Sequence, residues 1–151
     1  MSTKEKYTIR RIKKTDYDSG LIELLGQLTS ISKDNIPRDK FDDYVETLLQ
    51  NNNHITIVVE TTLSKSVVGT ATLLIEPKLI HNISKVGHVE DVVVDKNCRG
   101  EGIGKMMLDY LTRKAEILEC YKVILDCDSK NVPFYEKCGF ENKGVEMALY
   151  Y

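Results

Sequence analysis

The residues with the clearest chemical potential in this sequence are three glycines between positions 100 and 104. Gly100, Gly102 and Gly104 alternate with other residues and are flanked by Arg99 and Lys105. Glycine lets the backbone approach a ligand closely, and the free N–H groups and the dipole of a helix start favour an anion. The pattern therefore predicts a pyrophosphate site at a point where a strand turns into a helix.

This glycine pattern differs from two common nucleotide-binding motifs. A P-loop has a longer spacing before its Gly-Lys pair and then Ser or Thr, whereas Met106 follows Gly104-Lys105 here. A dinucleotide fold has Gly-x-Gly-x-x-Gly near the start of several βαβ units, whereas Gly-x-Gly-x-Gly lies in the last third of this chain. A glycine-rich turn without any ligand is the other interpretation.

The hydrophobic pattern predicts the strands and helices that would position these glycines at the surface. Apolar runs and alternation predict strands at residues 7–12, 55–60, 67–75, 88–94, 123–125 and 145–149. Helical spacing predicts helices after Asp16 as N-cap, from Pro37, after Gly104 and at residues 131–137. This order predicts a single α+β domain over residues 1–151, with a mixed, mostly antiparallel sheet flanked by helices.

Composition is that of an ordinary globular domain and narrows the expected partners. Of 151 residues, 42% are hydrophobic and 29% charged, and the formal net charge is −2. No basic face and no apolar stretch of about 20 residues is visible, so neither nucleic acid nor a membrane is an expected partner. The four cysteines and three histidines match no metal-ligand spacing, so reduced thiols, no metal and a cytoplasmic location are expected.

Further segments make the pattern around Gly100 more specific. Arg-x-x-Gly-x-Gly at residues 99–104, after an apolar strand, resembles the acetyl-CoA signature of the GNAT acetyltransferases. Together with residues 87–94, 120–128 and 131–140, it resembles the glucosamine 6-phosphate N-acetyltransferases. The resemblance implies a GNAT-like fold and a homodimer with a site at the subunit interface. It also implies transfer of the acetyl group of acetyl-CoA to glucosamine 6-phosphate, a step toward UDP-N-acetylglucosamine.

The same resemblance implies where acetyl-CoA binds. The pantetheine arm would pair with the backbone of Val92, Val93 and Val94, as an added strand would. The pyrophosphate would lie at Arg99, Gly100, Glu101, Gly102, Ile103, Gly104 and Lys105. The rest of the cofactor would be bordered by Asp126, Cys127, Asp128, Asn131 and Tyr135.

For the sugar, the resemblance implies a site whose members come from several separate segments. These residues are Thr29, Lys78, Leu79, Ile80, His81, Glu90, Asp91, Tyr121 and Lys122. Members of this family carry an arginine near the C-terminus that assists the sugar phosphate, whereas this chain has Tyr150 there. Recognition of the phosphate is therefore expected to depend more on Lys78, His81 and Lys122.

Three of these residues are candidates for the chemistry. Glu90 is expected to accept the proton of the sugar amine and Asp91 to orient the amine; alternatively, both form a polar step that faces solvent. Tyr135 is expected near the thioester sulfur, where its phenol can protonate the leaving thiolate; alternatively, it packs in the core with Phe134 and Phe140. The competing functions are acetylation of another small amine or a protein amine, and acetyl-CoA binding without turnover.

Overall fold

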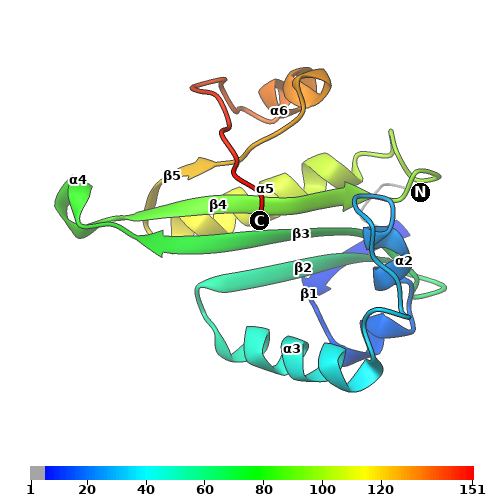
Figure 1. The fold of residues 1–151 in the computed structure, drawn as a ribbon. Helices are drawn as coiled ribbons and strands as arrows, with labels where there is room; N and C mark the ends of the chain where they lie inside the picture. The colour runs from blue at the N-terminus through cyan, green and yellow to red at the C-terminus, as the bar shows by residue number, and fades with distance from the viewer. Residues whose placement is uncertain (1–5) are drawn as a thin grey trace.

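A computed structural model describes residues 6–151, which fold around a five-stranded sheet (Figure 1). The strands are β1 (Tyr7–Arg11), β2 (His54–Thr61), β3 (Val67–Pro77), β4 (Lys85–Val94) and β5 (Cys120–Ile124). The helices are η1 (Lys14–Tyr17), α2 (Leu21–Leu25), α3 (Arg38–Gln50), α4 (Ile80–Ile83), α5 (Ile103–Ile117), η2 (Ser129–Asn131) and α6 (Val132–Lys137). None of the helices described in residues 6–151 is long and apolar enough to span a bilayer.

The strands lie in sequence order across the sheet. Neighbouring strands from β1 to β4 pair antiparallel, whereas β4 and β5 pair parallel. The parallel pair requires a crossover connection, and α5 lies within it. The predicted α+β fold with a mixed, mostly antiparallel sheet flanked by helices is therefore confirmed.

Helices cover the two faces of the sheet at different places, so apolar side chains are buried on both. In β2, Ile55, Ile57 and Val59 pack into the core under α5, while the intervening Val58 packs with α2 and α3 on the other face. Figure 1 shows α5 behind the sheet and α3 beside β2. Each fully buried side chain of this size contributes about 1.5–3 kcal/mol, so these two cores hold the sheet in place.

The first helical segment differs from the predicted one, because Asp16 does not cap the helix at Leu21–Leu25. Asp16 lies in η1 and is fully buried. Its carboxylate accepts hydrogen bonds from Arg10 Nη2 at 2.6 Å, Arg10 Nη1 at 2.9 Å and the N–H of Lys13 at 2.7 Å. The residue before α2 is Gly20, with φ +99°. Asp16 is therefore a buried ion-pair residue, since a buried carboxylate needs such partners.

The strand predicted at residues 145–149 is wrong. These residues lie in a segment after α6 without regular secondary structure, and Val145 and Met147 are each 92% exposed. A strand needs a hydrogen-bonding neighbour, and this segment is not part of the sheet that residues 6–151 form. The apolar side chains of this alternating segment are therefore not buried against any part of the described chain.

Candidate active site

The predicted pyrophosphate turn joins the end of β4 to the start of α5. Gly100 and Gly102 have φ values of +82° and +84°, a region that residues with side chains rarely adopt. Gly102 directly precedes α5, and the N–H of Met106 donates to its carbonyl at 3.0 Å. The N–H groups of the helical turn before Met106 therefore have no intrahelical acceptor. The predicted strand-to-helix turn is formed, with a helix dipole that favours an anion.

The two basic side chains that flank the turn lie at the protein surface. Arg99 and Lys105 are exposed, and Lys105 Nζ pairs with Asp109 at 2.7 Å. Glu101 accepts a hydrogen bond from the Tyr7 hydroxyl at 2.8 Å, which directs its carboxylate toward β1. The acidic residue of the motif is therefore held by the N-terminal strand, while the two cations remain accessible.

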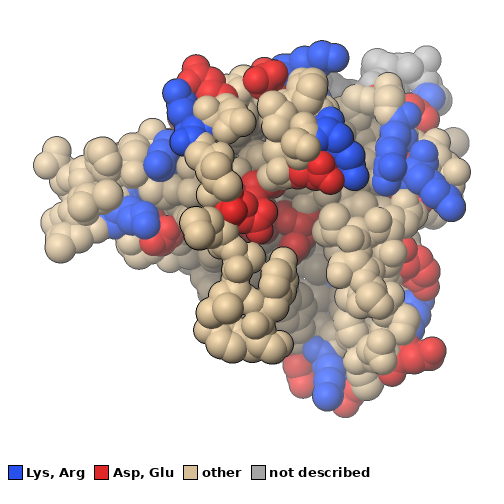
Figure 2. Space-filling model, turned by 45° about the horizontal axis from the view of Figure 1, so that its top comes forward, with Lys and Arg blue, Asp and Glu red and all other residues tan. Residues whose placement is uncertain are grey.

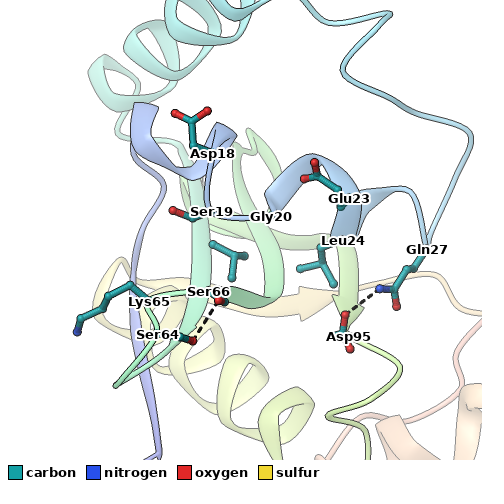
Figure 3. Close-up of a pocket in the computed structure, with 11 residues that line it drawn as sticks. Asp18, Ser19, Gly20, Glu23, Leu24, Gln27, Ser64, Lys65, Ser66 and Asp95 are labelled. Atoms are coloured by element: carbon teal, nitrogen blue, oxygen red, sulfur yellow. Dashed lines mark hydrogen bonds between the residues drawn. The ribbon is translucent and has the colours of Figure 1, made fainter.

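Sequence reasoning missed one residue that holds this turn in place, Gln27. Its side-chain amide donates to Asp95 Oδ2 at 2.9 Å, and its carbonyl oxygen accepts the N–H of Lys96 at 2.9 Å. Figure 3 shows Gln27 reaching Asp95 among the residues that line a cavity of about 470 Å³. The N–H of Asn97 and the Gln27 amide, in that order, lower the pKa of Asp95. Gln27 belongs to no motif and is distant in sequence, so no sequence signal would have found it.

β4 and β5 separate partway along β4, which leaves part of β4 with a free edge. Parallel pairing ends at His88 and Ile124, whereas β4 continues to Val94. On its other side, β4 stays paired with β3 to its end. The backbone of Val92–Val94, predicted to pair with pantetheine, therefore has one edge without a strand partner in the described sheet. An extended ligand can add to such an edge.

A β-bulge in β4 positions the acidic pair. Asp91 has φ +52° and, with Val92, lies opposite the single β3 residue Ala71, where the register shifts. Val89 is buried under α5, so strand alternation places Glu90 on the opposite face. Asp91 is kept on that same face, where it lines a cavity with apolar side chains of α2 and α3. The structure therefore brings Glu90 and Asp91 together on one side of the sheet.

The cavity beside Asp91 has a volume of about 290 Å³ and also involves Tyr44 of α3. Burial, and then the charge of Asp91, raise the pKa of Tyr44. The pKa of Glu90 is raised first by partial burial and then by the charges of Asp91 and Asp126, while His88 opposes this effect. Figure 2 shows acidic side chains gathered around a hollow in the surface. A carboxyl group whose pKa is raised toward neutral pH is suited to general base catalysis.

Tyr135 lies on α6 and packs against the core formed by α5 and the sheet. Its ring centroid is 5.0 Å from that of Phe134 and 6.1 Å from that of Phe140, both in edge-to-face arrangements. Burial raises the pKa of its phenol, and nearby Cys127 and Cys138 add to this effect. The ring contacts agree with the packing interpretation, and the place beside the thioester sulfur stays a prediction.

The predicted sugar-binding residues form groups that lie apart in one chain. At the tip between β3 and β4, the ring centroid of His81 lies 4.2 Å from that of Tyr121 on β5. Lys122 Nζ lies 5.5 Å from the Tyr121 ring, and Lys78 is at the base of the same tip. Thr29 follows α2, and Figure 1 shows α2 and the tip at α4 toward opposite ends of the sheet. One chain therefore does not bring Thr29 to the His81–Tyr121 pair.

The remaining predicted cofactor residues follow β5. Asp126, Cys127 and Asp128 connect β5 to η2, and Asp128 accepts the N–H of Lys130 at 3.1 Å. Asn131 directly precedes α6. This segment begins where β5 leaves β4, so it borders the opening in the sheet. Within residues 6–151, no group of three or more His, Cys, Asp or Glu side chains is arranged to hold a metal ion.

Comparison of the sequence and the fold with known proteins shows the family to which the chain belongs. A profile described as "Acetyltransferase (GNAT) family" matches residues 21–140. The chain is 41% identical over 150 residues to a glucosamine 6-phosphate N-acetyltransferase of Candida albicans, covering 98% of each protein. It is 39% identical over 148 residues to the Arabidopsis thaliana enzyme of that name, covering 97% of this chain and 98% of the relative. The crystal structure of the Arabidopsis enzyme superposes with a TM-score of 0.92 at 39% identity, over 96% of this chain and 98% of that one. The predicted GNAT-like fold is confirmed.

Proposed function

Because the chain belongs to the GNAT acetyltransferases and, within them, to the glucosamine 6-phosphate N-acetyltransferases, we propose that it transfers the acetyl group of acetyl-CoA to glucosamine 6-phosphate. The products are CoA and N-acetylglucosamine 6-phosphate. The similarity over nearly the whole chain to enzymes of that name carries this proposal. A cytoplasmic location is part of it, and the four free thiols suit a reducing compartment.

The β4–α5 turn fits the donor. Acetyl-CoA supplies the acetyl group as an activated thioester and carries a pyrophosphate in its nucleotide half. The open first turn of α5 would receive the pyrophosphate at Gly100–Lys105, where Arg99 and Lys105 add exposed positive charge. The free edge of Val92–Val94 would pair with the pantetheine arm, and the segment 126–131 would border the remainder.

The acidic pair and Tyr135 would carry out the proton transfers. Glu90 would accept the proton of the sugar ammonium, because its carboxyl lies on the exposed face of β4 and its pKa is raised. Asp91, held beside it by the bulge, would orient the amine. The phenol of Tyr135 stays protonated because burial raises its pKa, so it can supply a proton to the leaving sulfur.

The sugar phosphate would be bound by the cations at the tip between β3 and β4. Lys78, which forms an ion pair with Glu76, and Lys122 carry positive charge there, and His81 and Tyr121 lie ring to ring. Tyr150, where relatives carry an arginine, is 88% exposed and has no positive charge to contribute. The cationic tip therefore has to supply the charge that an arginine would otherwise provide.

A homodimer would complete the site, as a consequence of where these groups lie. Thr29 follows α2, and α2 and the tip at α4 lie toward opposite ends of one sheet (Figure 1), so a second chain would place the tip of one subunit beside the β4 acids of the other. The segment after α6 exposes Val145, Met147 and Leu149 by 77–92%, and β5 is an edge strand of the described sheet. An unpaired edge and an alternating apolar segment are complementary surfaces for two copies.

The backbone of the tip also supports an interface there. His81, Asn82 and Ile83 have φ values of +55°, +60° and +58°, a left-handed conformation that costs about 1–2 kcal/mol for each residue. Ile83 and Leu79 are 78% and 85% exposed, so the described chain buries neither. Burial of these side chains against a second subunit would offset that conformational cost.

A thiol-release assay tests the proposed function directly. Purified protein is incubated with acetyl-CoA and one of three acceptors: glucosamine 6-phosphate, unphosphorylated glucosamine or a lysine peptide. Glucosamine 6-phosphate should have a kcat/KM at least about tenfold above glucosamine, because a hydrogen-bonded charge contributes about 1.5–3 kcal/mol. Release only with the peptide would favour another GNAT activity, and acetyl-CoA binding without release would favour a binding module.

A further inference from the structure

Gly104, in the first turn of α5, is covered by the ring of Phe134 from α6. A Cβ atom at position 104 would lie 2.9 Å from Phe134 Cζ and 3.4 Å from Cε2. Cβ atoms in proteins essentially never lie within 3.0 Å of another heavy atom in this way, so an alanine here would have to displace the ring. From the sequence, Gly104 is expected to let a ligand approach the backbone; in the structure the ring of Phe134 packs against the side where a Cβ atom would lie.

The same ring is in contact with the candidate acid of the reaction. Phe134 and Tyr135 have ring centroids 5.0 Å apart at an interplanar angle of 67°, and Tyr135 in turn packs edge to face on Phe140. Such edge-to-face pairs contribute about 0.5–1.5 kcal/mol and restrict ring orientation. A displacement of Phe134 would therefore be transmitted to the phenol of Tyr135.

Side-chain contacts hold α6 in place, among them the packing of Tyr135 against the core. The helix has six residues, and none of them is fully buried. A helix this short is not stable by itself, so its place depends on individual side-chain contacts with its neighbours. The contact of Phe134 with Gly104 joins α6 to the turn predicted to bind the donor pyrophosphate.

We infer that Phe134 is a positioning residue for the acetyl transfer, which packs on Gly104 and so fixes the phenol of Tyr135 relative to the donor turn. This inference rests on the proposed function, because it assigns Tyr135 to the leaving sulfur. Gly104 is then required for the ring of Phe134, and its neighbours Gly100 and Gly102 for the backbone conformation of the turn.

A size-exchange cycle tests the inference. Gly104→Ala, Phe134→Leu and the double variant are compared by kcat in the thiol-release assay at saturating substrates. Gly104→Ala should lower kcat about tenfold, since a misplacement of about 1 Å can cost up to 10²-fold. The smaller leucine leaves room for the alanine, so the double variant should return to within about threefold of Phe134→Leu alone.

The same substitutions in a Tyr135→Phe background show whether the loss of kcat depends on the Tyr135 phenol or reflects a general disturbance of the active site. If Phe134 acts through the phenol, Gly104→Ala should lower kcat by less than about threefold once that phenol is absent. A tenfold loss in this background, or an unrescued double variant, would overturn the inference. An unrescued loss confined to the KM for acetyl-CoA would instead return Gly104 to direct ligand contact.

An NMR measurement that needs no catalytic turnover tests the position of the Tyr135 ring independently of the proposed function. In NMR spectra of ring-labelled tyrosine, the Tyr135 signal is identified by its loss in Tyr135→Phe. It should shift in Gly104→Ala and return toward its original position in the double variant; an unmoved signal contradicts the inference. Wild-type protein that releases no CoA with glucosamine 6-phosphate would contradict the proposed function alone.

Discussion

The side-chain amide of Gln27 lies 2.9 Å from the carboxylate of Asp95 and joins the segment after α2 to the start of the β4–α5 turn. A second bond, from the N–H of Lys96 to the Gln27 carbonyl oxygen, makes the connection bidentate. Thr29 lies two residues beyond Gln27 and Arg99 four beyond Asp95. One glutamine therefore connects a segment assigned to the acceptor with the turn assigned to the donor.

Gln27→Ala should weaken donor binding without abolishing catalysis. Two hydrogen bonds of about 1 kcal/mol each are lost, so the KM for acetyl-CoA should rise about tenfold while kcat changes by less than about threefold. Steady-state kinetics with varied acetyl-CoA measures both quantities. Gln50→Ala, at an exposed glutamine near the end of α3, is the matched control and should leave the KM unchanged. Equal effects in the two variants would remove Gln27 from the donor turn.

Glu90→Gln should remove the acid limb of the pH profile of kcat/KM. Because the pKa of Glu90 is raised, the wild-type activity should increase with pH above the ordinary glutamate value of about 4.3, as the carboxyl ionises. The glutamine cannot accept a proton, so activity should fall about 10²-fold at the wild-type optimum. An acid limb that persists unchanged in the variant would mean that another group is the base.

The same substitution should stabilise the fold at neutral pH. A raised folded-state pKa means that the folded chain binds more protons than the unfolded chain, so stability falls as pH rises through that pKa. Glu90→Gln avoids this loss, and its thermal midpoint at pH 7 should equal or exceed that of the wild type. The difference should shrink below about pH 4, where both forms are neutral. A variant that is less stable than wild type at pH 7 would contradict the assigned direction.

Met147→Asp should convert a dimer into monomers. The side chain is 92% exposed in the single chain, and a buried unpaired charge at an interface is strongly unfavourable. Sedimentation velocity should show a dimer for the wild type and a monomer for the variant, with activity at least about tenfold lower because the site is incomplete. Leu63→Asp is the control, since Leu63 in the β2–β3 turn is 89% exposed. A fully active wild-type monomer would refute the dimer.

Asp16→Ala should be strongly destabilising. The substitution leaves Arg10 without its bidentate partner and the N–H of Lys13 without its acceptor, which costs about 3–5 kcal/mol for a buried pair. Asp18 pairs with Arg38 at the surface, so Asp18→Ala should cost less than about 1 kcal/mol. Urea unfolding compares the two variants, and similar costs would mean that burial of Asp16 is unimportant.

The sequence by itself determined the parts of this protein that depend on a few consecutive residues. Two apolar runs separated by the turn residues 64–66 predicted the antiparallel strands β2 and β3, because such runs and turns are local features of the sequence. Gly100 and Gly102 before an amphipathic run predicted the β4–α5 turn, because only such residues adopt positive φ readily at a helix start. Membership of the family followed from several such segments together.

Only the tertiary structure decided which distant groups meet. Asp16 pairs with Arg10 instead of capping α2, the ring of Phe134 packs on Gly104, and the amide of Gln27 donates to Asp95. The bulge that turns Asp91 to the side of Glu90 depends on the register between β3 and β4, which neither strand contains alone. The alternating segment at residues 145–149 formed no strand within the described chain, because a strand is defined by a neighbour and no local pattern can supply one.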